Sequence, residues 1–507
     1  MPHHPPLPPH SPHSPLLRRL ARLPLLALLL ACCLAARAQQ PDPDNARKAK
    51  DLENQAVLAF HRGELDTAAT LFELQRQLTP RSFIVHFNLA CTRALLGEVD
   101  EAESRIARAI ELGFDDVHTL RLDPALAPIR EGDLYTDLLN NWPRILEARR
   151  QSIVTRDQGW TRGRYTDRAD ESLRIVVRSA YSDEATDLAL ADLQAVATFL
   201  TDTLFTELPK EPWHSHTPWV SVVLPNERDY VAWAEHAVGG AARGLASVGG
   251  AYDDHTKRLV AQDLGATLWH EFAHALHYRD AARNHQTHAL WIVEGIGALV
   301  ETFDTNEDGS ITPAPDWRLN SLKRAKERAL LNPVADLAAA THEDFNGPAT
   351  LRTYAHARAV FLFLSQRGQL TDFYTAYTET LPDDPSGLTA LETATGFTPE
   401  LFDDALNAWL DTLPMVPETF EEAGAAIACD LTHGEGDGPK VSGFGEATKG
   451  RDALKLGSVI THVNAHPTRD LRELARTLAN YQPGDTVTLT ARRARLVSQI
   501  QTTLVEP

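Results

Sequence analysis

The stretch HEFAHALHYRD, from His270 to Asp280, determines how the rest of the chain is interpreted. It has helical character, and His270 and His274 are four residues apart, so their imidazoles lie on one helix face, one turn apart. Two imidazoles placed in this way can bind one tetrahedral zinc ion. Glu271 is directed toward the same site without occupying a coordination position, as a general base should be. The stretch therefore predicts a zinc-binding helix that carries its own base.

A third ligand is expected from WIVEGIGALVE, residues 291–301. Glu294 lies 20 residues after His274, on a second predicted helix whose Gly295 and Gly297 allow close approach to a neighbouring helix. Two histidines and one glutamate leave the fourth position open for water, which is the arrangement of a catalytic zinc site. Glu301 is the alternative ligand, but we favour a role in which it fixes an imidazole N–H.

These two segments resemble the gluzincin metallopeptidases, whose pattern is HExxH followed by a helix carrying W-x-x-E-G-x-A. Gly297 stands where the family usually has Ala. The resemblance implies a zinc metallopeptidase domain over residues 150–415, made of a small mixed sheet and a helical lobe. It also implies peptide-bond hydrolysis by a zinc-activated water, with Glu271 as general base. Relatives often stabilise the oxyanion with a downstream Tyr or His; of Tyr354 and His356, we choose Tyr354.

Within this region the residue pattern predicts strands before the zinc helix. Residues 172–181 and 219–225 are rich in β-branched residues, and residues 184–205 and 229–238 have helical periodicity. A hairpin is expected to turn at Asp253–Asp254 and to end in RLVA, residues 258–261. We expect that last strand to pair with an extended substrate.

Residues 46–140 contain a repeat. Gly63 recurs as Gly97 and Ala68 recurs as Ala102, both at an offset of 34, which is the period of the tetratricopeptide helical hairpin. Such hairpins can form a concave peptide-binding surface. Because only about two repeats are present, we favour a helical spacer that packs on the next domain.

Residues 418–507 resemble a PDZ domain of the exported bacterial type. The matching pieces are Leu456–Ile460, Val463–Asn464, the helix from Asp470 to Leu478, and Pro483–Asp485. The resemblance implies a β-rich domain that adds a peptide to a sheet edge, and the alternative is a docking domain with a closed groove. We expect this segment to fold separately from the peptidase core.

The N-terminus has the pattern of a signal peptide over residues 1–38. Arginines at 18, 19 and 22 precede an apolar run over 23–36, and Ala36-Arg37-Ala38 is a small-x-small cleavage signal. We therefore expect export to a bacterial periplasm or cell envelope, or secretion, with lipidation at Cys32 as an alternative. No transmembrane span is expected after cleavage. Cys91 and Cys429 are expected to be free thiols.

Two further features limit the partners. The net charge of −20 argues against nucleic acid. DTNEDGSITPAP, residues 304–315, places Asp304, Asn306 and Asp308 as in a calcium loop, but its twelfth position is Pro315 and not Glu. A solvated acidic turn is the favoured interpretation, and Ca²⁺ is the minor one.

The sequence thus predicts a multidomain α+β chain: a helical-repeat segment, a gluzincin core and a PDZ-like β-rich domain. The expected function is that of an exported metallopeptidase with one Zn²⁺ and a peptide or protein substrate. The alternative is a catalytically silent, zinc-containing scaffold that binds peptides through its repeat and PDZ-like domains. The presence of Glu271 favours the enzyme, because a silent site needs no base.

Overall fold

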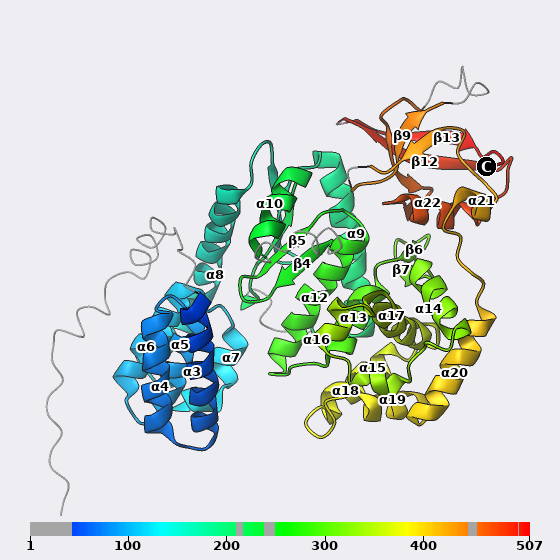
Figure 1. The fold of residues 1–507 in the computed structure, drawn as a ribbon. Helices are drawn as coiled ribbons and strands as arrows, with labels where there is room; N and C mark the ends of the chain where they lie inside the picture. Colours follow the sequence, from blue (N-terminus) through cyan, green and yellow to red (C-terminus); the bar gives the residue numbers. More distant parts are fainter. Residues whose placement is uncertain (1–42, 209–215, 238–248, 435, 445–453, 495) are drawn as a thin grey trace, which may run out of the picture. The chain divides into compact units, whose positions relative to one another are not determined.

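The computed structural model describes residues 43–507 except 209–215, 238–248, 435, 445–453 and 495 (Figure 1). The chain divides into two compact units, Met1–Ser152 and Ile153–Pro507. The predicted signal peptide and Cys32 lie outside the described residues. Among the helices that are described, none combines the length and the apolar character that crossing a membrane requires.

The first unit begins with two helical hairpins. Gly63 and Gly97 end the first helix of each hairpin with φ angles of +74° and +79°, a left-handed conformation that glycine adopts readily. Ala68 and Ala102 are both fully buried between the paired helices. The 34-residue offset therefore corresponds to two equivalent hairpins, while their peptide binding stays a prediction. The helices of this unit are α3 (Pro43–His61), α4 (Leu65–Leu78), α5 (Phe83–Leu95), α6 (Val99–Leu112), α7 (Val117–Leu122), the 3₁₀ helix η2 (Pro124–Ile129) and the first part of α8 (Asp133–Trp160), which continues past Ser152 into the second unit.

A five-stranded mixed sheet opens the second unit, as the sequence predicts. Its order is β1-β2-β3-β5-β4, in which β2, β3 and β5 are parallel and the outer strands are antiparallel. The central strand β3 is buried at all five positions, as expected for a parallel strand that is covered on both faces. The strands are β1 (Thr166–Asp170), β2 (Ile175–Ser179), β3 (Val220–Leu224), β4 (Gly250–Asp253) and β5 (Arg258–Ala261).

Different helices cover the two faces of this sheet. Val222 and Leu259 belong to the large core formed with α9 (Asp183–Thr203) and α12 (Ala266–Arg283). Val223 and Val260, one residue further along, pack instead with α10 (Glu227–Ala237). The alternation follows from the two-residue period of a strand.

The hairpin predicted near Asp253 is confirmed, but the expectation for residues 258–261 is wrong. These residues form β5, which pairs with β3 on one side and with β4 on the other. Both edges of β5 are therefore used within the sheet, and it cannot receive a substrate strand. The outer strand on this side is β4, a distinction that depends on long-range pairing and not on local pattern.

The helical lobe follows the sheet and contains α13 (Leu290–Leu299), the helix that carries Glu294. Gly295 of α13 lies so close to α17 that a Cβ there would be 2.5 Å from the ring of Phe361, which confirms the predicted close approach. The lobe consists of α12, α13 (Leu290–Leu299), β6 (Phe303–Thr305), β7 (Ile311–Pro313), α14 (Trp317–Glu327), α15 (Val334–Ala338), α16 (His342–Asn346), α17 (Thr350–Gln366), α18 (Leu370–Thr380), α19 (Leu388–Thr395) and α20 (Pro399–Thr412).

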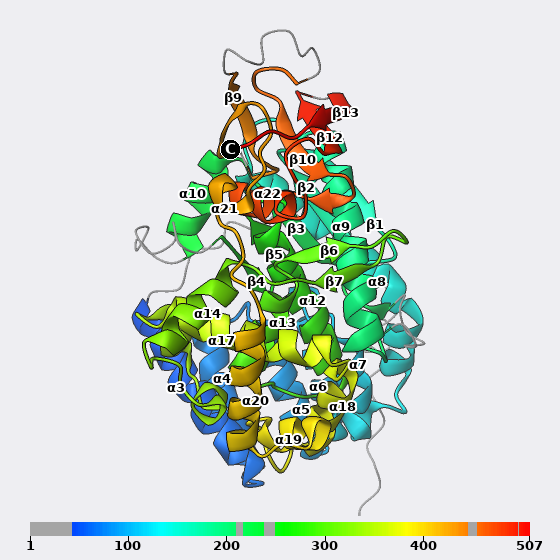
Figure 2. The same cartoon turned by 90° about the vertical axis from the view of Figure 1, so that its right-hand side faces the viewer.

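The C-terminal segment is β-rich, as predicted, with its own apolar core around Ile460, Leu474 and Leu489. It nevertheless belongs to the same compact unit as the lobe and lies beside α9 and the β6–β7 hairpin (Figures 1 and 2). Its elements are α21 (Phe420–Ala423), β8 (Asp430–Thr432), β9 (Lys440–Gly443), β10 (Val459–Val463), β11 (His466–Pro467), α22 (Leu471–Leu478), β12 (Thr486–Arg493) and β13 (Leu496–Thr503). We call residues 418–507 the tail domain; a PDZ-type groove in it stays a prediction.

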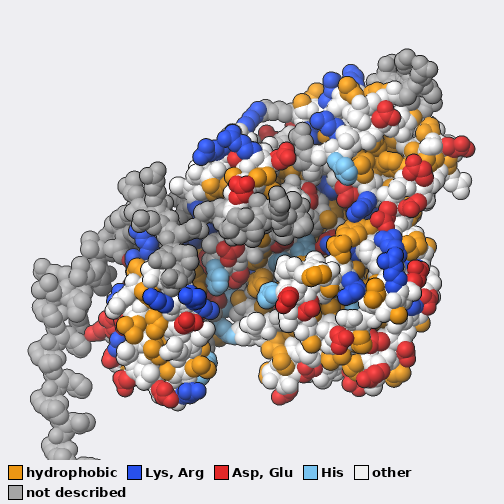
Figure 3. All heavy atoms as spheres, in the orientation of Figure 1, with side chains coloured by type: hydrophobic (Ala, Val, Ile, Leu, Met, Phe, Trp, Pro, Cys, Tyr) orange, Lys and Arg blue, Asp and Glu red, His pale blue; other side chains and the backbone are white. Residues whose placement is uncertain are grey.

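Charged side chains are spread over the surface. The chain has 69 acidic residues against 49 Lys and Arg residues. On the face drawn in Figure 3, acidic, basic and apolar side chains are interspersed among the described residues. Cys91 and Cys429 are free thiols, as expected.

Candidate metal centre

The helix α12 holds the two histidines in a buried position. Trp269, Phe272 and Ala273 are fully buried in the large core, which fixes the helix on the sides away from the histidines. His270 and His274 are only 7% and 8% exposed, and their ring centroids are 4.6 Å apart at an interplanar angle of 87°. The i, i+4 spacing therefore places both imidazoles side by side, as predicted.

Glu294 of α13 completes a set of three converging ligand atoms. Its Oε2 lies 3.2 Å from Nε2 of His270 and 3.7 Å from Nε2 of His274. Among the described residues, these three are the one group of potential metal ligands whose atoms lie within 4.8 Å of one another. Tetrahedral zinc with bonds of about 2.1 Å separates its ligand atoms by about 3.4 Å. The observed distances and the donor types, two imidazoles and a carboxylate, fit zinc.

Neighbouring charges shift the pKa values of His270 and Glu294. Burial by itself lowers the pKa of His270, but its hydrogen bonds to Glu294 and Glu301 outweigh burial and raise that pKa to about 10. Burial works against ionisation of Glu294 as well, yet the adjacent His274 and His270 hold its pKa far below the usual range. The Glu294 carboxylate is therefore ionised, the state that a metal ligand requires.

A second layer of side chains supports His270. Oε1 of Glu301 lies 3.0 Å from Nδ1 of His270, on the side of the ring opposite Glu294. Arg318 of α14 donates to both oxygens of Glu301, at 2.5 Å from Nε and 2.9 Å from Nη2. These contacts hold the His270 ring so that Nε2 faces Glu294. Sequence reasoning reached Glu301 but missed Arg318, because no local spacing connects residues on separate elements.

The glycine at position 297 has a local explanation. A Cβ there would lie 2.9 Å from Nε2 of His270, closer than side chains normally pack. The residue that replaces the family's usual alanine therefore leaves room for the ring of this histidine in its observed position.

Glu271 lies between the converging ligands and the outer strand β4. Its carboxylate accepts the backbone N–H of Tyr252, and a Cβ on Gly250 would be 3.2 Å from its Cγ. Burial raises the pKa of Glu271, while His274 and His270 act in the opposite direction. A carboxylate with a raised pKa beside a metal site is suited to accepting and returning a proton.

Tyr354 of α17 also lies at this site. Its ring centroid is 6.0 Å from that of His270. Burial, followed by the charge of Glu294, raises the pKa of Tyr354, so the hydroxyl remains a hydrogen-bond donor. His356, the other candidate, is buried, and burial lowers its pKa to about 4. Tyr354 is therefore the better placed of the two.

Two further residues of α12 lie near the histidines. His277 is buried, its Nε2 is 2.7 Å from Nδ1 of His288, and its ring stacks on Phe205. Tyr278, which sequence reasoning missed, is 41% exposed with its ring 6.5 Å from that of His274. The i, i+4 spacing from His274 is the signal that places Tyr278 near the site.

The acidic loop 304–315 shows no such convergence among its described residues. Asp304 pairs with Arg476 of the tail domain at 2.8 Å, and Asp308 accepts hydrogen bonds from the backbone and hydroxyl of Ser310. Asn306 donates to Ser310 and Thr312. Residues 306–310 form an exposed turn in which Asp308 is bonded by Ser310, and calcium binding by the loop stays the minor prediction.

Comparisons with known proteins add little. No protein-family model and no curated protein sequence matches the chain. Among solved structures, an aminopeptidase N family protein from Idiomarina loihiensis matches with a TM-score of 0.26 and 13% identity, covering 68% of this chain and 67% of that one. A likeness this weak does not establish a shared fold. The function of the site therefore has to be judged from the residues described above.

Proposed function

We propose that the chain is a zinc-dependent metallopeptidase. The observation that carries the proposal is the convergence of His270, His274 and Glu294 within 4.8 Å, with the Glu271 carboxylate beside them. A structural zinc site is normally closed by four protein ligands, whereas three ligands and an adjacent base are typical of catalytic sites. The silent scaffold is less well supported, because it gives Glu271 no role.

The chain's own residues can carry out the proton transfers. Zinc held by His270, His274 and Glu294 would activate water and polarise the scissile carbonyl. Glu271 accepts the proton of the attacking water and delivers it to the leaving amine. Tyr354 donates a hydrogen bond to the developing oxyanion.

The strand β4 is the proposed site of substrate pairing. Among the described strands it is the last on its side of the sheet, and its Tyr252 N–H already contacts the base Glu271. A peptide added in extended form along Gly250–Asp253 would therefore bring its backbone next to Glu271. This geometry supports peptides or proteins as substrates.

The test is cleavage of casein and of a peptide library by wild-type protein and by Glu271→Ala, with zinc content measured in both. We expect about one zinc per chain in both proteins and cleavage only by the wild type, with a loss of about a thousandfold in the variant. Equal cleavage by the two proteins would remove Glu271 from the mechanism. Equal zinc with no cleavage by either would favour the scaffold.

Export is proposed separately, from the signal pattern before residue 39. Fractionation of the native host should yield a mature chain that begins near Gln39, or at Cys32 if that residue is lipidated. Recovery of the full-length chain from the cytosol would contradict export and leave the metal site unaffected.

A further inference from the structure

The tail domain covers the connection that leads into the zinc helix. Residues 262–265 join β5 to α12, and the N–H of Leu264 donates to the carbonyl of Gly436 at 2.8 Å. Gly436 packs so closely that a Cβ there would lie 2.5 Å from Oη of Tyr181 and 2.8 Å from the carbonyl oxygen of Gln262. The backbone of Gly436 therefore lies directly on this connection.

Arg469 of the tail domain contacts the first turn of α12 itself. A Cβ on Gly265, the residue that precedes the helix, would be 2.5 Å from Cβ and 2.6 Å from Cγ of Arg469. The guanidinium continues past Gly265 to an ion pair with Asp192 of α9, and Arg469 is only 6% exposed. One buried side chain thus joins the tail domain, α9 and the start of the zinc helix.

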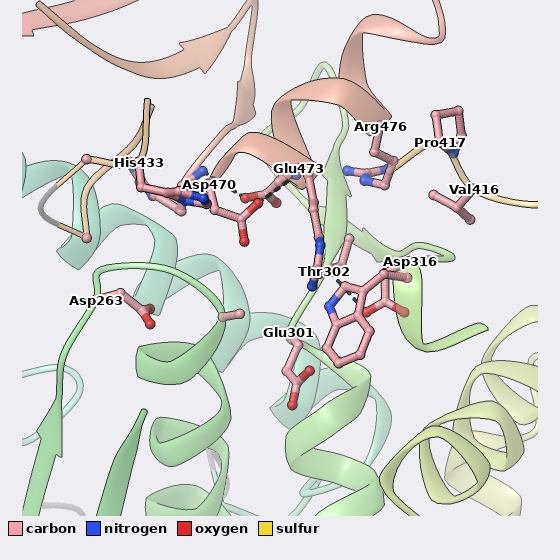
Figure 4. A pocket seen from close by; sticks show the side chains of 16 residues that line it. Asp263, Glu301, Thr302, Asp316, Val416, Pro417, His433, Asp470, Glu473 and Arg476 are labelled. Carbon is pink, nitrogen blue, oxygen red and sulfur yellow. Dashed lines mark hydrogen bonds between the residues drawn. The ribbon is translucent and has the colours of Figure 1, made fainter. Parts of the chain in front are cut away.

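The core fixes the same turn from its own side. Oδ1 of Asp263 accepts the N–H groups of Gly265 and Thr267 at 2.9 and 3.2 Å, and Oδ2 accepts the Thr267 hydroxyl at 2.6 Å. These bonds satisfy N–H groups that a helix start otherwise leaves free. A cavity of about 190 Å³ lies at this junction. Asp263 and Glu301 line it from the core and Glu473 from the tail domain (Figure 4). The junction therefore extends to Glu301, the carboxylate that holds His270.

We propose that Arg469 is a positioning residue for the metal site: it holds the first turn of α12 so that His270 and Glu271 keep their places. The proposal rests on the proposed zinc site. His270 is the fifth residue of α12, and the first turn of a helix frays unless it is held. A ligand set binds its metal tightly only when its supporting contacts fix it to within a fraction of an ångström.

The tail domain then contributes to the metal site, in contrast to the expectation that it folds and acts separately. Arg476 offers a matched control, because it makes a different contact between tail and core: an ion pair with Asp304 on β6, at 2.8 Å. Its removal weakens docking without touching residues 262–266.

The experiment compares the full-length variants Arg469→Ala, Arg469→Lys and Arg476→Ala with the wild type. Zinc affinity is measured by chelator competition, and amide hydrogen exchange over residues 264–271 is measured in metal-free protein. For Arg469→Ala we expect zinc affinity to fall about tenfold, as for other supports of a metal ligand, and exchange to become about tenfold faster. Arg469→Lys should lose less zinc affinity and exchange more slowly than Arg469→Ala, because lysine keeps an aliphatic stem over Gly265 and a positive charge for Asp192. Arg476→Ala should match the wild type in both.

The proposal would be overturned if amide exchange in Arg469→Ala were as slow as in the wild type. It would also be overturned if Arg469→Ala and Arg476→Ala changed exchange and zinc affinity equally. Should Arg469→Ala fail to fold, Arg469→Met decides: it removes the ion pair and should speed exchange about threefold, and unchanged exchange would count against Arg469. Because exchange is measured without metal, it tests Arg469 even if the wild type binds no zinc. A wild type that binds no zinc would contradict the proposed function and not the role of Arg469 in holding the first turn of α12.

Discussion

The helices α12 and α13 and the acidic loop 304–315 each carry potential metal-binding side chains, but among the described residues the helices bring theirs together and the loop does not. Nε2 of His270 and Oε2 of Glu294 lie 3.2 Å apart although 24 residues separate them, whereas Asp304 and Asp308 of the loop each bond to other partners. In the first region, rigid elements direct the side chains inward from different parts of the chain. In the second, Asp308 is bonded within its own turn and Asp304 pairs with Arg476 of the tail domain.

The difference shows that suitable residue types at a suitable spacing do not by themselves make a metal site. Further contacts must hold the ligands in place. The three proposed ligands converge on one another, while Glu301 and Arg318 hold the other side of the His270 ring. The loop has no comparable second layer among its described residues. We therefore expect substitutions in the two regions to have very different consequences.

Removal of a ligand should have the largest effect. His274→Ala and Glu294→Ala each delete one of three protein ligands, and we expect zinc affinity to fall by about a thousandfold or more. Asp308→Asn, the control in the loop, should bind zinc like the wild type. Metal analysis after dialysis against a weak chelator measures the difference. Full zinc occupancy in Glu294→Ala would remove that residue from the site.

Loss of the proposed oxyanion donor should rank next. Tyr354→Phe keeps the ring beside His270 and deletes only the hydroxyl. We expect kcat to fall about a hundredfold while KM and zinc content stay near wild-type values. Steady-state kinetics on a short fluorogenic peptide measures both parameters. An unchanged kcat would show that Tyr354 only packs against His270.

Substitution of a residue that supports His270 should weaken zinc binding less than removal of a ligand does. Glu301→Gln retains an acceptor for Nδ1 of His270 but loses the charge and the two-point contact with Arg318. We expect zinc affinity to fall about tenfold. Chelator competition measures it, with Asp304→Asn as a control that also loses an arginine partner. If the two variants weaken zinc equally, the support of His270 is not specific to Glu301.

Glu473 lines the cavity between the tail domain and the core. Its substitution should have the smallest effect of these variants. Burial, followed by the charge of Asp470, raises its pKa to about 8, from 4.5 for an ordinary glutamate. The folded state therefore holds a proton that the unfolded state has released, and the free energy of unfolding should fall as the pH rises from about 5 to about 8. Glu473→Gln should reduce this fall by about 1 kcal/mol. Urea unfolding of the wild type and of Glu473→Gln at both pH values measures this fall. If the free energy of unfolding falls equally in the two proteins, Glu473 is not its source.

Local pattern predicts much of the site. The i, i+4 histidines and the glycines of α13 follow from helix periodicity and from the close approach of helices. The place of β4 at the end of the described strand order and the contact between Glu301 and Arg318 do not, because both depend on pairing between segments that are distant in sequence. The contact between Arg469 and Gly265 joins residues more than 200 positions apart, and no spacing rule connects them.

The central claim is that one zinc ion is bound by His270, His274 and Glu294. The most direct test is a crystal structure of the full-length, zinc-loaded protein, with diffraction data collected on both sides of the zinc absorption edge. The account predicts one strong anomalous peak within bonding distance, about 2.1 Å, of Nε2 of both histidines and of the Glu294 carboxylate. A peak in the loop between Asp304 and Asp308, with none at the histidines, would contradict it.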